Sequence, residues 1–137
     1  MTISSLCCKK AKVFISVLSG KNEVPPNCSK AKGTLKAILS ENKDKLKFEL
    51  DTCGLKNITG AHFHLGGKGF NGPIVKHIKI DKCTGKAKGV WSKDDCKEPL
   101  TSCLVKKLLS GCIYVNVHTC KYPDGEIRDQ VDILHKH

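Results

Sequence analysis

The sequence has little arginine, few aromatic residues and no long apolar run. Arg128 is the only arginine among 137 residues, and Phe, Trp and Tyr together make up 5% of the chain. Specific nucleic-acid readers rely on arginine forks and stacking aromatic rings, so we expect no specific nucleic-acid binding despite the net charge of +11. No apolar stretch approaches the ~20 residues of a membrane-spanning helix. We therefore expect no membrane span, and we interpret the lysines as a solvated surface.

Motifs for several kinds of chemistry are also missing. No Cys-x-x-Cys pair occurs, which argues against a zinc knuckle or a thioredoxin-type centre. No nucleophile-base pair or carboxylate pair stands out from the surface residues, so we expect no enzyme. Met1 to Cys8 has no basic opening and the apolar segment Val13 to Leu18 is short, so the chain shows no convincing secretory signal.

What the sequence does have is period-2 alternation from end to end. In Lys45 to Leu50, apolar side chains alternate with charged ones, which is the pattern of a half-buried strand. The pattern predicts about eight strands, which are Val13–Leu18, Thr34–Leu39, Lys45–Leu50, Ile58–Leu65, Ile74–Ile80, Lys86–Trp91, Ile113–Thr119 and Glu126–Leu134.

One segment has helical spacing instead. Pro99 to Ser110 carries leucines at helical intervals, Pro99 suits a first turn and Gly111 suits a stop. Many short strands with one short helix near residues 99–110 predict an all-β fold, an antiparallel two-sheet sandwich or flattened barrel. The length fits one domain. We expect a connector arm over residues 1–12 and a sandwich domain over 13–137.

Three histidines form the first candidate site. His62 and His64 lie two apart on one predicted strand, so both imidazoles leave the same face. If the strand of His118 is a neighbour, three rings converge and suit copper or zinc, with His77 as a fourth ligand and Asp124 or Glu126 orienting a ring. The alternative is structural, with the imidazoles bonded to backbone carbonyls and no metal. The terminal His135 and His137 are expected to be solvated.

Nine cysteines are many for a reduced protein, so we expect most to be oxidised. Adjacent cysteines bond each other only under strain, so Cys7 and Cys8 on the arm are expected to reach two different partners and to cross-link a neighbouring subunit. The alternative is a reactive, unpaired tail. Because every bond uses thiols in pairs, one of nine must stay free, coordinate something or pair with its own copy. The other disulfide candidates are Cys28, Cys53, Cys83, Cys96, Cys103, Cys112 and Cys120.

Five motifs in order resemble the CHRD domain, first described in chordin. They are Asn22-Glu23-Val24-Pro25-Pro26, Ala61-His62-Phe63-His64-Leu65-Gly66, Gly69-Phe70-Asn71-Gly72-Pro73, Tyr114-Val115-Asn116-Val117-His118-Thr119 and Gly125-Glu126-Ile127-Arg128. The resemblance covers about residues 13–131. Members usually carry glycine after the last arginine, where this chain has Asp129. The resemblance implies an all-β fold, and the paired histidines add a looser likeness to the Greek-key sandwich of Cu,Zn superoxide dismutase. It implies no enzymatic activity.

The Cys-Cys arm ahead of a β-sandwich looks like the subunits of disulfide-linked bacterial endospore appendages. Our first hypothesis is therefore a structural subunit that self-assembles into a disulfide-cross-linked fibre or layer at a cell or spore surface, bonded through Cys7 and Cys8. The alternative hypothesis is a copper- or zinc-binding domain that uses His62, His64 and His118. A third reading, a ligand-binding module, rests on the glycine loop Gly66 to Pro73, although turn geometry also explains those glycines.

Overall fold

The computed structural model describes residues 11–134, which form strands and two short helices. Cys7, Cys8, His135 and His137 lie outside the described residues. In chain order the elements are β1 (Lys12–Ser19), the 3₁₀ turn η1 (Gly20–Asn22), β2 (Lys32–Leu39), β3 (Lys45–Cys53), β4 (Ile58–Leu65), β5 (Ile74–Ile78), β6 (Lys86–Ser92), the helix α2 (Ser102–Leu109), β7 (Ile113–Thr119), β8 (Ile127–Gln130) and β9 (Asp132–Ile133).

The strands follow the alternation of the sequence. In β2 every second residue is buried, ending with Leu35, Ala37 and Leu39, while the residues between them face solvent. Successive side chains of a strand point to opposite faces, so this pattern places one face of β2 on the core. The all-β antiparallel class predicted from the sequence is confirmed.

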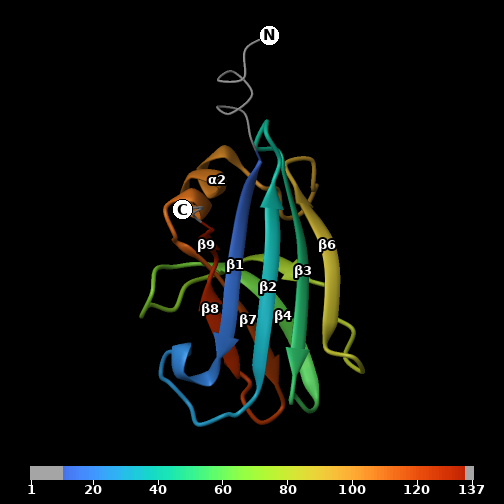
Figure 1. The fold of residues 1–137 in the computed structure, drawn as a ribbon, viewed down its shortest axis with the longest axis vertical. Coiled ribbons are helices and arrows are strands. Elements are labelled where there is room, and N and C mark those ends of the chain that lie inside the picture. Colours follow the sequence, from blue (N-terminus) through green and yellow to red (C-terminus); the bar gives the residue numbers. More distant parts are fainter. Residues whose placement is uncertain (1–10, 135–137) are drawn as a thin grey trace.

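All the strands belong to one curled sheet (Figure 1), in the order β5-β4-β7-β8-β1-β2-β3-β6, with β9 paired to β1. A single pair, Ser19 with Arg128, joins β1 to β8 between the two halves. The edge strands β5 and β6 are linked by a short ion pair, 2.7 Å from Lys76 Nζ to the Asp95 carboxylate just after β6. The molecule is therefore a nearly closed sandwich, and the predicted two sheets are halves of one sheet.

The core fills the space between the two halves. Phe63 of β4 stacks on Trp91 of β6, with ring centroids 5.4 Å apart, and meets Phe48 of β3 edge to face at 5.2 Å. All three rings are at most 4% exposed. The indole N–H of Trp91 donates to the carbonyl oxygen of Glu98 at 2.8 Å, so its polar atom is satisfied.

Most predicted strands differ from the structure by one to three residues at an end, and two further predictions were wrong for a clear physical reason. The helix begins at Ser102, because the hydroxyl of Thr101 accepts a hydrogen bond from the Leu104 N–H and caps the first turn, which leaves Pro99 outside it. The predicted last strand is two strands, because the chain leaves β7 at Gln130 and joins β1 at Asp132. Gly111, at φ +78°, follows the helix as the sequence indicated.

Antiparallel pairing gives the sandwich two ends. We call the end where β1 begins the near end; it carries segments 40–44, 93–101 and 110–112 and helix α2. The glycine loop over 66–73 lies along the side of the sandwich instead, where Asn71 donates to the carbonyl oxygen of Val24 shortly after β1. The far end, where β1 finishes, carries segments 20–31, 54–57, 79–85 and 120–126. Within residues 11–134 no helix is long and apolar enough to cross a bilayer.

Candidate functional site

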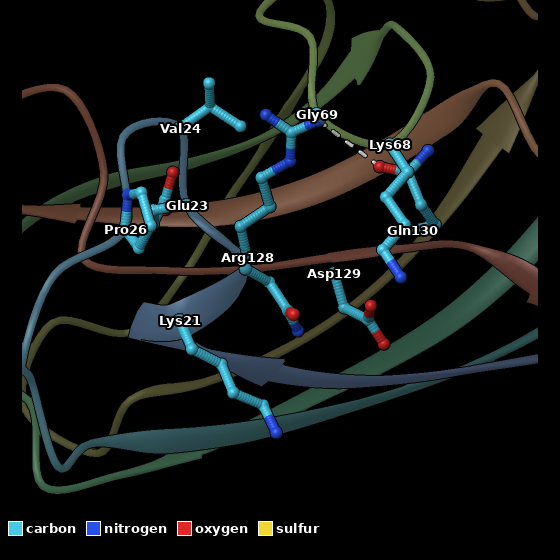
Figure 2. A pocket seen from close by; sticks show the side chains of 10 residues that line it. Lys21, Glu23, Val24, Pro26, Lys68, Gly69, Arg128, Asp129 and Gln130 are labelled. Carbon is cyan, nitrogen blue, oxygen red and sulfur yellow. Dashed lines mark hydrogen bonds between the residues drawn. The ribbon is translucent and has the colours of Figure 1, made fainter.

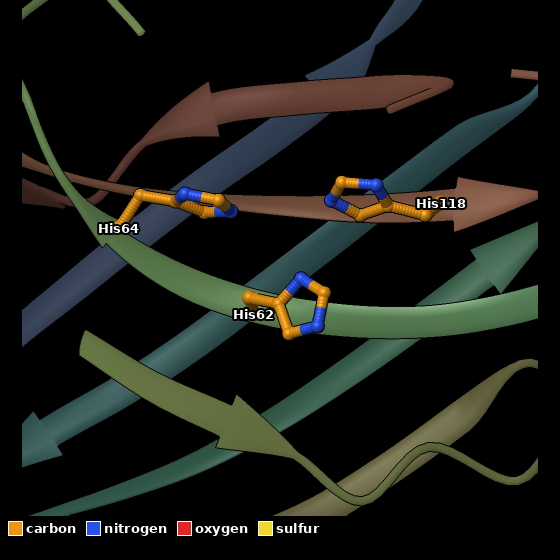
Figure 3. Close-up of side chains that lie close together, drawn as sticks. All are labelled: His62, His64 and His118. Carbon is orange, nitrogen blue, oxygen red and sulfur yellow. The ribbon is translucent and has the colours of Figure 1, made fainter. Parts of the chain in front are cut away.

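The structure brings His62, His64 and His118 together on one face of the sheet (Figure 3). His62 and His64 belong to β4, and His118 belongs to β7, which pairs with β4 in antiparallel register. One ring nitrogen of each residue lies within 4.8 Å of those of the other two. Figure 3 shows a nitrogen of each ring turned toward the space between the rings. The predicted convergence of the three imidazoles is present.

Both nitrogens of His64 and of His118 face oxygen atoms. In each ring Nδ1 lies against a backbone carbonyl, that of Gly72 at 2.9 Å for His64 and that of Pro123 at 2.8 Å for His118. The Nε2 atoms of the two rings share one contact, the side-chain oxygen of Asn116, at 2.9 and 3.0 Å. A neutral imidazole carries one N–H, so it can donate only one of its two contacts.

His62 lies between the other rings. Its Nδ1 is buried and has no hydrogen-bond partner within the described part of the chain. Burial, with the neighbouring His118 and His77, lowers the pKa of His62 to about 4. Burial also lowers the pKa of His64. Both rings are therefore neutral at pH 7, and a neutral imidazole has a free lone pair.

A buried carboxyl group stands behind Asn116. Glu23, which follows η1, is 5% exposed, and burial raises its pKa to about 7, against the opposing effects of Arg128 and of a hydrogen bond from Asn116. Gly125 leaves room for the Glu23 carboxyl group beside Asn116, because a Cβ at position 125 would lie 2.5 Å from a carboxyl oxygen of Glu23. Since the Asn116 amide nitrogen faces Glu23, its oxygen is directed at the two histidines.

Arg128 explains the glycine loop. Its guanidinium donates to the carbonyl oxygens of Gly67 and Phe70 at 3.1 and 2.8 Å and to the side-chain oxygen of Asn71 at 3.1 Å. It also lies 3.5 Å from the centre of the Tyr114 ring. The hydrogen bonds of Arg128 therefore explain the conformation of the loop Gly66 to Pro73, which was the basis of the ligand-binding hypothesis.

A hollow of ≈ 290 Å³ lies beside this arginine (Figure 2), with Lys21, Glu23 and Asp129 on its walls. Asp129, which departs from the family's usual glycine, accepts a hydrogen bond from the backbone N–H of Val17 at 2.7 Å. Its carboxylate thus bonds β8 to β1 beside the single backbone pair that joins these strands.

The other residues expected to assist the three histidines make different contacts. His77 is 4.8 Å from His62 between ring centres, but its Nδ1 contacts the carboxylate of Glu98 at 2.6 Å, and it is outside the group of three. Glu126 accepts hydrogen bonds from Thr119 and Ser29 rather than from an imidazole. Among the described residues the backbone carbonyl of Pro123, not the carboxylate of Asp124 or Glu126, orients His118, so the predicted carboxylate partner was wrong.

The cysteines lie at the two ends of the sandwich. The seven that the structure describes are free, and six of them are exposed. The far end has Cys28, Cys53, Cys83 and Cys120, while the near end has Cys96, Cys103 and Cys112. Cys53, the last residue of β3, and Cys103, in α2, are the only ones of the seven inside a strand or helix. None of these seven disulfide candidates is bonded to another within residues 11–134.

The sequence motifs contained Asn116 and Glu23, but their roles were missed. They are 93 residues apart, and the Asn22-Glu23 turn lies beside β7 because β8 pairs with both β1 and β7. Asn116 points to the same face as His118, opposite to the core valines on either side of it, yet it is only 3% exposed. A buried amide needs hydrogen-bond partners, and no pattern in the sequence indicated that burial.

Comparison with known proteins gives one match. The family model described as the CHRD domain matches residues 14–131. No curated protein and no solved structure matches the chain.

Proposed function

The chain belongs to the CHRD domain family, and from this premise we propose that it is a structural subunit without catalytic activity, whose copies join end to end through disulfides. The observation that carries the proposal is the placement of the described thiols at the two ends of the sandwich, free and largely exposed. Copies stacked along the sandwich axis would bring the far-end thiols of one subunit to the near end of the next, where the arm that carries Cys7 and Cys8 begins. The product would be a fibre or layer at a cell or spore surface.

Length decides which thiols the arm can reach. Cys8 precedes Lys12 by four residues, and an extended chain spans at most about 14 Å over that distance. The eight residues of β1 cover about 23 Å. A disulfide tolerates at most about 7 Å between Cα atoms. Cys8 therefore falls short of the far end of its own molecule, and Cys7 reaches it only if stretched straight along β1.

A stacked neighbour removes this difficulty. If its far end meets the near end of the first molecule, the thiols at that far end lie beside the start of β1, where the arm begins. A repeated head-to-tail contact does not close and so produces a fibre. The rival is a bond from the arm to a near-end thiol of its own molecule, which would leave a monomer.

The bond itself is ordinary thiol chemistry. For each disulfide, two thiols lose two protons and two electrons to an oxidant such as dioxygen or a small disulfide. Because the described thiols are exposed, the oxidant has access without unfolding. Oxidation would make a reversible contact between subunits covalent.

Non-reducing electrophoresis and electron microscopy test this proposal on protein purified in reductant and then oxidised. We expect a ladder and fibres that disappear with reductant. Cys7→Ser with Cys8→Ser should abolish both, whereas the matched double variant Cys96→Ser with Cys103→Ser should keep both.

A monomer band that persists after oxidation would contradict the proposal. So would a ladder that survives the loss of Cys7 and Cys8. Circular dichroism before oxidation verifies that each variant is folded, so that a missing ladder reports lost bonding rather than lost structure.

A further inference from the structure

The histidine cluster provides three nitrogen donors that point into one space. The backbone carbonyls of Gly72 and Pro123 lie at hydrogen-bond distance from Nδ1 of His64 and of His118. Both contacts of each ring are acceptors, and we place the ring proton on Nδ1, because each backbone carbonyl serves one ring whereas the Asn116 oxygen is shared by two. In the neutral form of each ring the lone pair is then on Nε2, and metal-binding histidines commonly have this arrangement, with the other nitrogen donating to a carbonyl.

The Nε2 contacts with Asn116 are then unfavourable without a cation. The amide oxygen lies 2.9 and 3.0 Å from two nitrogens whose protons are committed elsewhere. A positive ion between the rings would turn this repulsion into coordination. The unpartnered Nδ1 of His62 supplies a third lone pair, and its burial without a hydrogen bond is a cost that a ligand would remove.

From these contacts we infer a metal site at the centre of this cluster, which takes copper or zinc through Nδ1 of His62 and Nε2 of His64 and His118. Imidazole nitrogens suit these metals, whereas calcium and magnesium require oxygen ligands. With three protein ligands, one position stays open to water or a small anion. The site does not depend on the thiols or on assembly.

The test uses protein whose thiols have been alkylated, since cysteines bind the same metals. Zinc is added, and the imidazole nitrogens are followed by NMR, which identifies each nitrogen that becomes coordinated. We expect about one zinc ion per chain, with shifts at Nδ1 of His62 and at Nε2 of the other two rings. Copper(II) should show nitrogen coordination by electron paramagnetic resonance.

Variants provide the controls. Losing only an outer partner of a liganding histidine weakens metal binding about 10–100-fold, so His118→Ala should weaken it at least about 100-fold. His77→Ala removes an imidazole just beside the cluster and should leave affinity unchanged, as should His135→Ala with His137→Ala. The wild-type spectra decide the question even if His118→Ala does not fold.

Two results would overturn the inference. One is the absence of any shift at the three named nitrogens when zinc or copper is present in excess. The other is stoichiometric binding that survives His118→Ala and disappears with His77→Ala or with the terminal pair.

Discussion

Replacing the buried Glu23 by glutamine should change how stability depends on pH. The folded protein holds the Glu23 proton up to about pH 7, whereas the unfolded chain loses it near the ordinary pKa of 4.5. Between these values the folded state binds more protons, so the free energy of unfolding falls as pH rises. The difference of about 2.5 units corresponds to about 3 kcal/mol.

Other groups make the wild-type profile a poor test. The pKa of His62 is lowered to about 4, so its contribution to stability is lost as pH falls through that value, which is the opposite trend in the same range. The useful quantity is the free energy of unfolding of the wild type minus that of Glu23→Gln. We expect this difference to fall by about 3 kcal/mol as pH rises from 4.5 to 7.

Urea unfolding of both proteins in reductant measures that difference, with equal m-values as the check that both unfold in the same way. A difference that stays constant with pH, or that grows toward pH 7, would refute a carboxyl group protonated by burial. A fall in this free-energy difference with rising pH would also assign the proton to Glu23 rather than to the histidines, which are present in both proteins.

Four further variants test the fold. Gly72→Ala would place a Cβ 1.7 Å from the carbonyl oxygen of Leu65 and should lower stability by about 2–4 kcal/mol, whereas Gly67→Ala, with nothing within 4 Å, should cost under about 1 kcal/mol; urea unfolding compares them. Arg128→Met leaves three oxygens without their donor and should cost about 3 kcal/mol, with faster amide exchange in the glycine loop. Thr101→Ala removes the helix cap and should lower the thermal midpoint by an amount equivalent to about 1 kcal/mol.

The strands were predictable because their signal is local. Ile58–Leu65 and Ile113–Thr119 have the predicted bounds, since each alternating run ends where a turn begins. The helix start and the break at Val131 depend on contacts that a local pattern lacks. Val131 donates to the carbonyl of Ile113 as the chain passes between β7 and β1.

The candidate site was predictable only in part for the same reason. The two-residue spacing puts His62 and His64 on one face of a strand. The approach of His118 requires β4 to pair with β7, and this pairing joins segments that are distant in the sequence: His64 and Asn116, which are in contact, are 52 positions apart. The sequence indicated that most cysteines lie outside strands and helices. It did not indicate how they divide between the two ends of the sandwich, because that depends on which strands pair.

The partner of each arm thiol is the most direct test of end-to-end assembly. Equal amounts of isotopically heavy and light protein are mixed in reductant, oxidised, digested without reduction and analysed by mass spectrometry. We expect Cys7 or Cys8 of one isotope bonded to Cys28, Cys53, Cys83 or Cys120 of the other. Arm cysteines that stay reduced, or that bond only within peptides of their own isotope, would contradict assembly through the ends of the sandwich.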